Sequence, residues 1–506
     1  MASLTKQYAP EKLTGQIYTP PTVVEKILTD IGYASSAVLG KKILDPACGD
    51  GRFLTAIARK IIAWSVADSK SVADSKSSQK LRHNLECIYG WDIDADALAR
   101  CRAELDGLIA DQNIKVDWNL SARNSLTAFD GNNLFADSTA PRFDFIVGNP
   151  PYIRIQHLDL ATREYIQQHY DFCRSGSTDI YIAFYELCLN LLGETGVCGL
   201  VTPNTFLHTE TARNLRRYFV EHKNLRQITN YGEIQLFANA TTYSAITIFG
   251  KQPRKDFWYQ KALTAEKFTG RTYSFAELAE PFWQLSVSPR PKTGGKKLKE
   301  LCEIHVGITT LRDSAYIFPI SNGGKEWVWA RTKFGGETKI ERAILQPIVK
   351  GSKLKHSAQE ISEYVLFPYR RVNGKQRLIP EDELREFYPL AYAYLSSVRG
   401  ELDKRDNGRP NPAAWYAFGR TQSLDTSFGE KIIFSPMNER PNFVYYANPE
   451  CTFYSGYCLK YGGDIPRLLT QLNSPRMAEF VANSSRDFRN GWKAYNKKII
   501  ENFEVE

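Results

Sequence analysis

The stretch "ILDPACGDG", residues 43–51, determines the fold expected for the first half of the chain. A short apolar run enters a turn that contains Gly49 and Gly51, and the next residues, "RFLTAIARKIIAW" (52–64), carry apolar side chains at helical spacing. A strand that passes through a glycine turn into a helix is the opening unit of a doubly wound α/β sheet. Ligands bind to such sheets at the carboxyl ends of the strands, so this turn is a candidate binding site.

The same alternation continues along the chain. "LECIYGWDID" (85–94) predicts a second strand that ends in acids, and "ADALARCRAELDGLIA" (95–110) predicts a second helix. "RFDFIVGNPPY" (142–152) predicts a further strand and a loop. "STDIYIAFYELCLNLLGETG" (177–196) predicts a helix closed by its glycines, and "VCGLVTP" (197–203) predicts the next strand. The fold class that we expect is α/β, with a Rossmann-like, mostly parallel doubly wound sheet.

A tandem repeat interrupts this alternation. The hexapeptide "SVADSK" occurs at 65–70 and again at 71–76, and a polar tail continues to Gln79. Duplications of this kind are tolerated in surface loops, where no packing is disturbed. We therefore expect a surface loop here rather than a functional repeat.

The pattern loosens after residue 255. "SPRPKTGGKKLKE" (288–300) has the proline, glycine and lysine content of a linker, and short aromatic and β-branched segments follow it. We expect a ligand-binding domain at 1–255, a connecting segment at 256–297 and a second, mixed α/β domain at 298–506.

Charge is distributed unevenly between the two halves of the 506-residue chain. Residues 1–250 hold 25 Lys and Arg against 27 Asp and Glu, a net −2, whereas residues 251–506 hold 40 against 29, a net +11. The second half is either a solvated basic surface or a polyanion-binding region.

No apolar run reaches the ~18 residues of a membrane span, and the first residues lack a signal-peptide pattern, so a cytoplasmic protein is expected. The nine cysteines include no CxxC pair, so neither disulfides nor a zinc site are expected.

The glycine turn favours a cationic ligand. The third glycine of a dinucleotide fingerprint is missing, because Phe53 and Leu54 occupy its place. Asp45 and Asp50 would also repel a pyrophosphate. The second strand ends in Asp92, an acceptor for ribose hydroxyls. S-adenosylmethionine, which carries a sulfonium and an ammonium group, suits these acids.

The loop after the 142–152 strand has the groups needed for methyl transfer to an aromatic amine. Such a nitrogen is a poor nucleophile because its lone pair is delocalised, and two acceptors on its N–H groups would free that pair. The side-chain oxygen of Asn149 and the carbonyl of Pro150 can be these acceptors, held by the stiffness of Pro150 and Pro151. Tyr152 offers a ring on which a purine can stack. No strong base is needed.

At this point the chain resembles a known family, the amino-group DNA methyltransferases. The order of the motifs is that of the gamma-class N6-adenine enzymes, and of the TaqI-like type II modification methylases among them. The matching segments are "GQIYTPPTVVEKIL" (15–28), "LDPACGDGRFL" (44–54), "WDID" (91–94), "ARNSL" (122–126), "NPPY" (149–152) and "GEIQLFANATTYSAITIF" (232–249). Two further segments, "LKELCEIHVGITTLRDSAYIF" (298–318) and "NPAAWYAFGRTQSL" (411–424), resemble the C-terminal target-recognition domain of those methylases.

The resemblance implies a cofactor site and a catalytic site. The residues implied for S-adenosylmethionine are Tyr18, Thr19, Pro20, Asp45, Pro46, Ala47, Cys48, Gly49, Asp92, Ile93, Asn124, Ser125 and Asn149. Asn124 stands where the family usually has Asp, but its side chain can still accept a hydrogen bond from adenine. The catalytic residues implied are Asn149, Pro150, Pro151 and Tyr152, with Phe237 as the second aromatic against the target base and Tyr243 as the alternative to it.

The resemblance also implies a partner and a role. The target adenine is flipped out of duplex DNA, and residues 1–255 and 298–506 become the catalytic and target-recognition domains. The role implied is protective modification in a restriction-modification system, with a cognate endonuclease as a genetic partner. We expect a monomer without a metal ion. Candidate DNA-binding residues in the basic half are Arg370, Arg371, Lys375, Arg377, Arg409 and Arg420.

Four alternatives stay open at this stage. The sequence "NPPY" also occurs in enzymes that methylate the glutamine amide of release factors, but those chains are shorter and bind a protein. Methylation of RNA is compatible with the basic half. A fused nuclease would need a domain ahead of the motif that begins at residue 15, and none is expected there. A non-catalytic DNA-binding module would have no use for "NPPY".

Overall fold

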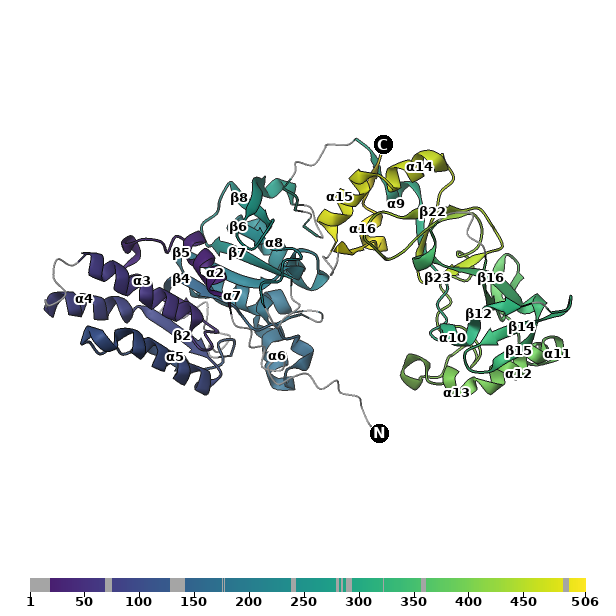
Figure 1. Cartoon of the computed structure of the whole chain (residues 1–506), viewed down its shortest axis with the longest axis horizontal. Coiled ribbons are helices and arrows are strands. Elements are labelled where there is room, and N and C mark those ends of the chain that lie inside the picture. Colours follow the sequence, from purple (N-terminus) through teal and green to yellow (C-terminus); the bar gives the residue numbers. More distant parts are fainter. Residues whose placement is uncertain are drawn as a thin grey trace. The chain divides into compact units, whose positions relative to one another are not determined.

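The chain forms two compact units, Met1–Arg290 and Pro291–Glu506, each with its own hydrophobic core (Figure 1). The computed structural model describes residues 19–68, 75–127, 142–174, 176, 178–237, 243–278, 282–283, 285–287, 294–321, 323–355, 361–485 and 491–506. Among these residues, no helix combines the length and the apolarity that crossing a membrane requires.

The first unit is built on one large sheet. Its described strands are β1 (Ile43–Asp45), β2 (Ile88–Asp92), β3 (Asn119–Ala122), β4 (Phe143–Gly148), β5 (Leu192–Pro203), β6 (Leu225–Asn230), β7 (Ser244–Gly250), β8 (Asp256–Ala262) and β9 (Phe268–Ser274). They lie in the order β3-β2-β1-β4-β5-β7-β6-β8-β9. The pairs from β3 to β5 and the pair β6–β8 are parallel, whereas β7 is antiparallel to both of its neighbours and β9 to β8. The expected α/β class is confirmed, and the sheet is mixed.

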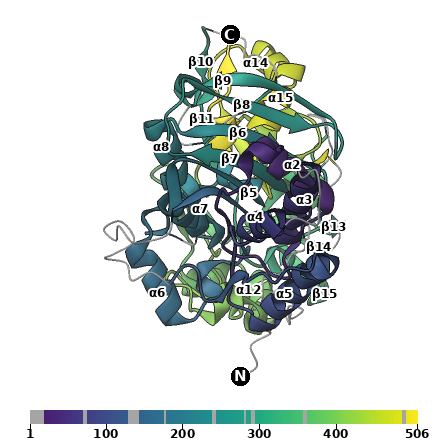
Figure 2. The ribbon, with the colours of Figure 1, turned by 90° about the vertical axis from the view of Figure 1, so that its left-hand side faces the viewer.

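Helices cover both faces of this sheet. They are α2 (Pro21–Asp30), α3 (Arg52–Asp68), α4 (Ser75–Leu85), α5 (Ala95–Ile109), α6 (Leu160–His169), α7 (Tyr181–Leu191) and α8 (Arg213–His222). Short 3-10 turns lie at Ser36–Val38, Ala110–Gln112, Ile155–His157, Asp171–Cys173, Asn204–Leu207, Glu210–Ala212 and Phe275–Glu277. Figure 2 shows α7 and α8 on one side of the strands and α2 and α3 on the other.

The strand sequences explain the two-sided core. Side chains alternate between the faces of a strand, and in β1 Ile43 packs with the α2, α3 and α5 side while Leu44 packs with the α7 and α8 side. In β4, Val147 packs with the α2, α3 and α5 side, and Ile146 packs with the α7 and α8 side. Strands that are apolar on both faces, such as these, belong in the middle of a sheet with helices on both sides. The carboxyl ends of β1, β2 and β4 therefore meet at one edge.

Two elements differ from the sequence expectation. Ser75–Leu85 forms α4, where a loop was expected to continue to Gln79, because its lysines, arginine and glutamine are good helix formers. The helix expected to end at the glycines 193 and 196 ends earlier, at Leu191, and β5 begins at Leu192. Gly196 lies within β5, and a side chain is excluded there because a Cβ would be 2.8 Å from the Phe143 carbonyl oxygen. This glycine allows close approach of strands rather than ending a helix.

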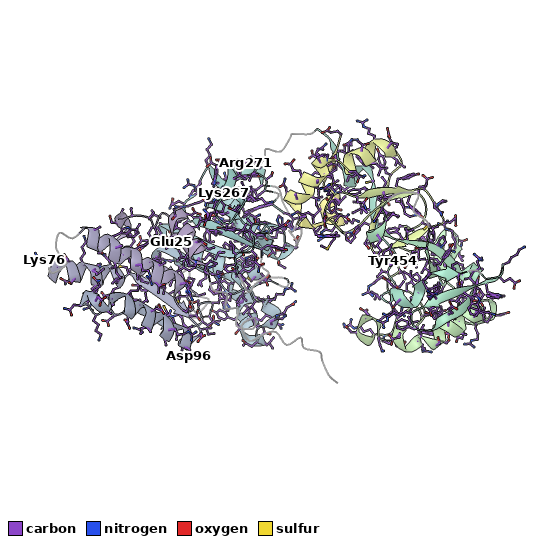
Figure 3. The ribbon with its side chains drawn as sticks, viewed as in Figure 1. Glu25, Lys76, Asp96, Lys267, Arg271 and Tyr454 are labelled. Atoms are coloured by element: carbon purple, nitrogen blue, oxygen red, sulfur yellow. The ribbon has the colours of Figure 1, made fainter. Side chains whose placement is uncertain are left out.

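The expected first domain boundary, at residue 255, falls inside the sheet. Strands β8 and β9 extend the sheet beyond it, so most of the predicted connecting segment is part of the first unit. The chain after β9 folds back on that strand, since Arg271 donates to the Ser286 carbonyl at 3.1 Å and the Tyr273 hydroxyl donates to it at 2.9 Å (Arg271 in Figure 3). The division between the units lies at Arg290, close to the expected start of the second domain at 298.

The second unit consists of small sheets and short helices. Its described strands are β10 (Lys296–Lys297), β11 (Glu303–Val306), β12 (Ile317–Phe318), β13 (Ile320–Ser321), β14 (Trp327–Thr332), β15 (Gly336–Glu341), β16 (Leu345–Lys350), β17 (Glu363–Leu366), β18 (Tyr369–Val372), β19 (Lys375–Leu378), β20 (Lys431–Phe434), β21 (Met437–Asn438), β22 (Phe443–Tyr446), β23 (Thr452–Tyr454), β24 (Tyr457–Lys460), β25 (Lys493–Ala494) and β26 (Glu504–Val505). Its described helices are α9 (Leu298–Leu301), α10 (Asp313–Tyr316), α11 (Glu381–Phe387), α12 (Pro389–Ser397), α13 (Arg399–Leu402), α14 (Ile465–Leu472), α15 (Pro475–Ser484) and α16 (Lys497–Ile500).

The larger sheets of this unit have the orders β11-β24-β20-β22, β12-β17-β16-β23 and β13-β14-β15. Tyr454, labelled in Figure 3, ends β23, and its hydroxyl donates to Glu363 on β17 at 3.0 Å. The two segments with target-recognition resemblance lie side by side, because Thr309 and Arg420 form an antiparallel bridge and the Tyr316 hydroxyl donates to the Tyr416 carbonyl.

Candidate cofactor and catalytic site

The site begins with the turn between β1 and α3. Gly49 and Gly51 have φ values of 53° and 88°, in the region that side chains with a Cβ rarely adopt. A Cβ at Gly51 would also lie 2.4 Å from the Cys101 sulfur. The backbone of the turn thus packs directly against α5 and leaves its outer face open to a ligand.

The ends of β1 and β2 are joined by a carboxylate. Asp92 accepts a hydrogen bond from the backbone N–H of Gly49 at 2.8 Å and another from Asp94 at 2.9 Å. Asp94 in turn caps α5 by accepting from the N–H groups of Asp96 and Ala97. Both acids are therefore fixed in position, and Asp92 keeps lone pairs for hydroxyl groups of a ligand.

Asp45 is the most deeply buried acid of the site, with 1% of its surface exposed. The pKa of its carboxyl group is raised to about 8, mainly by burial and also by the charge of Asp92, although a hydrogen bond from the Ala47 N–H opposes the change. Gly148 makes room for this carboxyl group, because a Cβ there would lie 2.9 Å from an Asp45 oxygen. A buried carboxyl group of this kind gains a partner when a cationic ligand binds.

The loop that carries the predicted catalytic residues follows β4 at the same edge of the sheet. The Asn149 side-chain amide donates to the Thr19 hydroxyl at 3.1 Å, and the Asn149 side-chain oxygen accepts from the Tyr152 hydroxyl. The Tyr152 hydroxyl also lies 3.2 Å from the Val201 carbonyl oxygen. Burial raises the pKa of Tyr152 well above its ordinary value, so the phenol stays protonated as a donor. Asn149 is thus held from both sides in one orientation.

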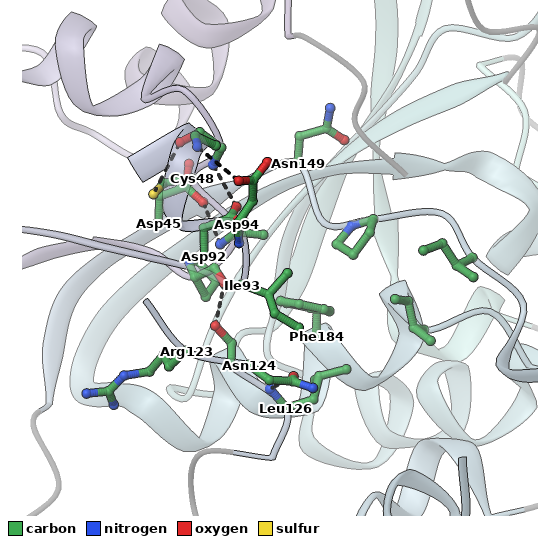
Figure 4. A pocket seen from close by; sticks show the side chains of 18 of the residues that line it. Asp45, Cys48, Asp92, Ile93, Asp94, Arg123, Asn124, Leu126, Asn149 and Phe184 are labelled. Atoms are coloured by element: carbon green, nitrogen blue, oxygen red, sulfur yellow. Dashed lines mark hydrogen bonds between the residues drawn. The ribbon is translucent and has the colours of Figure 1, made fainter. Parts of the chain in front are cut away.

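Asp45, Asp92 and Asn149 line one cavity of about 390 Å³ (Figure 4). Asp45, Asp92 and Asp94 gather at one side, with Leu126 and Phe184 at the other. Ile93 extends from the end of β2 with 73% of its surface exposed, which is unusual for so large an apolar side chain. The cavity therefore has an acidic part and an apolar wall, and the amide of Asn149 lies at its edge.

Most of the residues that the sequence predicted lie in this cavity. Those that line it are Thr19, Asp45, Pro46, Ala47, Cys48, Gly49, Asp92, Ile93, Asn124, Ser125, Asn149 and Pro151. Asn124 is bound within its own turn, since its side-chain oxygen accepts from the Leu126 N–H, and the Ser125 hydroxyl donates to the Pro46 carbonyl.

Other predicted residues lie elsewhere. Pro20 caps the start of α2, where its carbonyl accepts from Val23 and Val24, and it does not line the cavity. Pro150 is buried next to Asn149, and Tyr152 lies behind Asn149 with its ring edge-on to Tyr181 at 6.2 Å. Tyr18 lies outside the described residues.

Phe237 does not face the cavity. Its ring is 2% exposed and belongs to the core cluster on the α2 side of the sheet, together with Tyr231. A ring in that position has no free face for a base. Tyr243, the alternative, is half-buried, and its carbonyl accepts from the N–H of Asn204 just beyond β5.

The sequence did not single out the apolar wall. Beyond Leu126 and Phe184, it includes Ile153, Leu158, Ile166 and Ile180, from the loop after β4, α6 and the start of α7. Leu126 stands within the quoted motif "ARNSL" and Phe184 within the helix predicted at 177–196, and these segments were the available signal. Arg123 also lines the cavity, with its guanidinium 4.9 Å from the centre of the Trp91 ring.

The candidate DNA-binding residues lie at two places in the second unit. Arg370, Arg371, Lys375 and Arg377 are exposed on the β18–β19 hairpin, where Arg370 forms an ion pair with Glu383. Arg409 and Arg420 are exposed on a different loop, where Arg420 pairs with Asp406 at 3.3 Å.

S-adenosylmethionine fits the residues of the cavity. Asp45 is a buried carboxyl group without a cationic partner among the described residues, and a sulfonium or ammonium group would supply one. Asp92 can accept from ribose hydroxyls, and the exposed Ile93 offers an apolar surface for the face of adenine.

Comparisons with known proteins agree with this fit. Residues 86–237 match the family of the Eco57I restriction-modification methylase. The chain is 25% identical over 481 residues to the type II restriction enzyme and methyltransferase RM.Eco57I of Escherichia coli. The aligned region covers 81% of this chain and 48% of that protein. It is 23% identical over 504 residues to the type II methyltransferase M.BstVI of Geobacillus stearothermophilus. This alignment covers 89% of this chain and 82% of M.BstVI. The chain thus spans about half the length of RM.Eco57I.

Among solved structures, the fold is similar to that of the type IIL restriction-modification enzyme MmeI in complex with DNA. The TM-score is 0.62 at 13% identity, over 95% of this chain and 66% of that chain. At this identity the likeness concerns the fold alone. The α/β fold of the first unit, with its large mixed sheet, is similar to that of S-adenosylmethionine-dependent methyltransferases, and the sequence is similar to Eco57I-like type II restriction-modification methylases.

Proposed function

We propose that the chain is a site-specific DNA methyltransferase that transfers a methyl group from S-adenosylmethionine to N6 of a flipped-out adenine in duplex DNA. Its role would be protective modification in a type II restriction-modification system, of the gamma class and TaqI-like. The observation that carries the proposal is the position of Asn149, which lies at the edge of the same cavity as Asp45 and Asp92 and is held there by Thr19 and Tyr152.

The chemistry that this position supports is activation of an amine by hydrogen bonding. S-adenosylmethionine supplies an electrophilic methyl group on a sulfonium sulfur. The side-chain oxygen of Asn149 and the neighbouring Pro150 carbonyl are the two proposed acceptors for the amine. Two acceptors on the N–H groups of adenine make its nitrogen lone pair available, and because they are already oriented, little reorganisation is needed.

The cavity contains no general base among its described lining residues, since none of them is a histidine and the acids lie in the cofactor part. This suits an amine, whose proton becomes acidic once the methyl group has been transferred. It would not suit a hydroxyl nucleophile, which needs a base to remove its proton.

We assign the aromatic contacts of the flipped base to Tyr152 and Tyr243. The Tyr152 ring is half-buried, and its hydroxyl contacts the side-chain oxygen of Asn149. The position of Phe237 in the core does not support the stacking role, so Tyr243, half-buried at the start of β7, becomes the proposed second contact.

The choice of duplex DNA is supported by the relatives and by charge. RM.Eco57I is named as a type II restriction enzyme and methyltransferase and M.BstVI as a type II methyltransferase, and the MmeI structure is a complex with DNA. Residues 251–506 carry a net charge of +11, which supplies contacts to phosphates. We therefore propose the second unit as the target-recognition domain, with a cognate endonuclease as a genetic partner.

The test is direct. The protein is incubated with S-adenosylmethionine and unmethylated plasmid DNA, the DNA is digested to nucleosides, and N6-methyladenine is measured by mass spectrometry. Its appearance, with loss of the product in Asn149→Ala, supports the proposal. A protein that binds S-adenosylmethionine but methylates only RNA or a glutamine amide, or that forms N4-methylcytosine instead, refutes it.

A further inference from the structure

We infer that the β18–β19 hairpin of the second unit is the ribbon that recognises bases in the major groove of DNA, and that its outer face, with Val372, Lys375 and Arg377, contacts the base edges and the nearby phosphates. The inference rests on the proposed function, since it assumes that duplex DNA is the substrate. It adds which element recognises the sequence and which of the hairpin cations do so.

The hairpin has the dimensions of a groove-binding ribbon. Its strands of four residues pair antiparallel from Tyr369↔Leu378 to Val372↔Lys375, and they form a sheet of two strands only. Four residues span roughly 13 Å at ~3.4 Å each, and two strands are ~5 Å apart. The major groove of B-DNA is ~12 Å wide and admits a two-stranded ribbon. The turn residues Asn373 and Gly374 both have positive φ, 51° and 79°, as a tight two-residue hairpin requires.

The register divides the hairpin cations between two faces. Arg370 lies opposite Arg377, and these two residues share the outer face with the pair Val372 and Lys375. All four are exposed, and the apolar Val372 is 41% exposed. The other face, which carries Arg371, is the one that meets the body of the unit.

That inner face packs against protein at its base. Its residues there are Tyr369, which is buried, and Leu378, which is half-buried. Farther along, Arg371 and Gln376 of this face line a cavity with the acids Asp425 and Glu450, and Arg370 reaches the same cavity from the outer face. Acidic groups there would repel a phosphate backbone, so the inner face does not fit DNA.

On the outer face, one of the two arginines is already paired. Both terminal nitrogens of Arg370 donate to the carboxylate of Glu383 on α11. Arg377, directly across from it, forms no ion pair within the described part of the chain. Two like charges opposite each other would be destabilising, and Glu383 relieves this repulsion while leaving Arg377 available.

The hairpin is also held firmly, at its base by Tyr369 and Ile379 and closer to its turn by Gln376. The Tyr369 hydroxyl accepts from the Phe418 N–H at 2.8 Å, and the Gln376 N–H donates to Asp425 at 2.6 Å. The Ile379 N–H closes the base by donating to the Pro368 carbonyl at 3.0 Å. A hairpin alone is marginally stable in water, so these contacts give the exposed end a fixed direction. A fixed ribbon loses little entropy when it enters a groove.

The chemistry of the outer face fits base edges. A free guanidinium in the middle of a ribbon can donate two parallel hydrogen bonds to O6 and N7 of guanine. An exposed valine can contact the methyl group of thymine. Lys375, next to the turn, has a flexible point charge that suits a phosphate. We therefore assign base recognition to Arg377 and backbone contact to Lys375.

The experiment compares three variants that each remove one exposed cation from the same hairpin: Arg377→Ala, Lys375→Ala and Arg371→Ala. The methylation site is first mapped with the wild-type protein. Binding to a duplex with this site, to duplexes with single base changes and to an unrelated duplex is then measured at several salt concentrations. Methylation of the altered sites is measured in parallel, and thermal unfolding confirms that each variant is folded.

For Arg377→Ala we expect discrimination at one base pair to fall roughly 5- to 150-fold, which is the worth of one bidentate contact. For Lys375→Ala we expect an equal loss of affinity for all duplexes and a salt slope smaller by about 1, the effect of one phosphate contact. For Arg371→Ala discrimination stays as in the wild type.

Unchanged discrimination in Arg377→Ala overturns the inference, and so does a loss in Arg371→Ala as large as that in Arg377→Ala. The first result would show that the outer face does not recognise bases, and the second that only charge matters. Failure of the proposed function is a separate result, because it would appear as absence of N6-methyladenine with the wild-type protein.

Discussion

The proposed catalytic loop, Asn149–Tyr152, and the β18–β19 hairpin differ in what holds the side chains to which we assign a function. Asn149 is fixed by Thr19 on one side and Tyr152 on the other, and each of these partners is itself part of the first unit. Lys375 and Arg377 have no comparable partners in the described residues, and only the hairpin that carries them is fixed.

This difference follows from the two tasks. Methyl transfer to an amine needs the same acceptors in the same place whatever the DNA sequence, so the fold can orient them in advance. Recognition of a sequence requires side chains whose hydrogen bonds are made by DNA and not by the protein. Substitutions in the first region should therefore reduce the rate, and substitutions in the second should change which sites are methylated.

The largest effect is expected for Asn149→Ala. This change removes one of the two acceptors for the adenine amine, and loss of a single pre-oriented group at a reacting centre costs roughly 10²- to 10³-fold in turnover. S-adenosylmethionine binding should be nearly unchanged, because Asp45 and Asp92 are untouched. Single-turnover methylation and calorimetric binding measure the two quantities. Full turnover in this variant would contradict the proposed mechanism.

The next effect distinguishes the two candidate aromatics. Phe237→Ala should lower the free energy of unfolding by about 3 kcal/mol, because a buried ring is replaced by a cavity. Tyr243→Ala should leave stability nearly unchanged and weaken binding of a DNA duplex that carries an abasic partner opposite the target adenine. Chemical denaturation and DNA titration separate these outcomes.

If Phe237→Ala weakens DNA binding and Tyr243→Ala does not, the stacking role belongs to Phe237. A Phe237→Leu variant serves as the control, since it keeps an apolar side chain in the core and removes the ring. If Phe237→Leu is stable but binds the flipped base poorly, the core position of Phe237 is not the one that the enzyme uses with DNA.

A smaller effect is expected for Tyr152→Phe. The ring stays, but the hydroxyl that donates to the Asn149 oxygen is lost, and a hydrogen bond of this kind contributes about 1 kcal/mol. Turnover should fall roughly fivefold to tenfold with little change in the KM for DNA. Tyr152→Ala, which also removes the stacking surface, should raise that KM. Equal effects of the two variants would mean that the hydroxyl does not position Asn149.

The parts of this site that sequence could predict are those formed within one short stretch. Asp45 and Gly49 lie in one strand-turn-helix unit, and Asp92 ends the neighbouring strand, so alternation of strands and helices was enough to bring them together. The contact between Asn149 and Thr19 joins residues 130 positions apart, and only the folded chain shows it. The family resemblance supplied both residues but not the bond between them.

Apolar residues were harder to assign than polar ones. Phe184 lines the cavity and Phe237 lies in the core, although either ring suits either place. Sequence alone cannot separate these cases, because burial against protein and burial against a ligand demand the same side chain. In the hairpin, Asn373 and Gly374 do signal the turn, but only the strand register shows that Arg377 and Arg371 lie on opposite faces.

The smallest effect concerns pH and the acid of the cofactor part. Asp45 has a pKa of about 8 in the folded protein, raised first by burial, against an ordinary value of 3.8. Below pH 8 its carboxyl group is mostly protonated, and a cationic ligand favours the ionised form. Binding of S-adenosylmethionine should therefore release a proton, and its affinity should rise with pH up to about 8, by less than the tenfold per pH unit that one linked proton allows.

Asp45→Asn is the matched control for this prediction, because it keeps the shape of the side chain and removes the titration. The ligand's own ammonium group titrates equally with both proteins, so the difference between their pH profiles reports Asp45 alone. Without ligand, the free energy of unfolding of the wild type relative to Asp45→Asn should change with pH in the opposite direction to the relative affinity for the cofactor. Since the pKa of Asp45 is higher in the folded state than in the unfolded state, the free energy of unfolding of the wild type should fall relative to Asp45→Asn between about pH 4 and pH 8 and level off above. Parallel pH profiles for both proteins, in calorimetry and in unfolding, would show that Asp45 does not meet the cationic part of the cofactor.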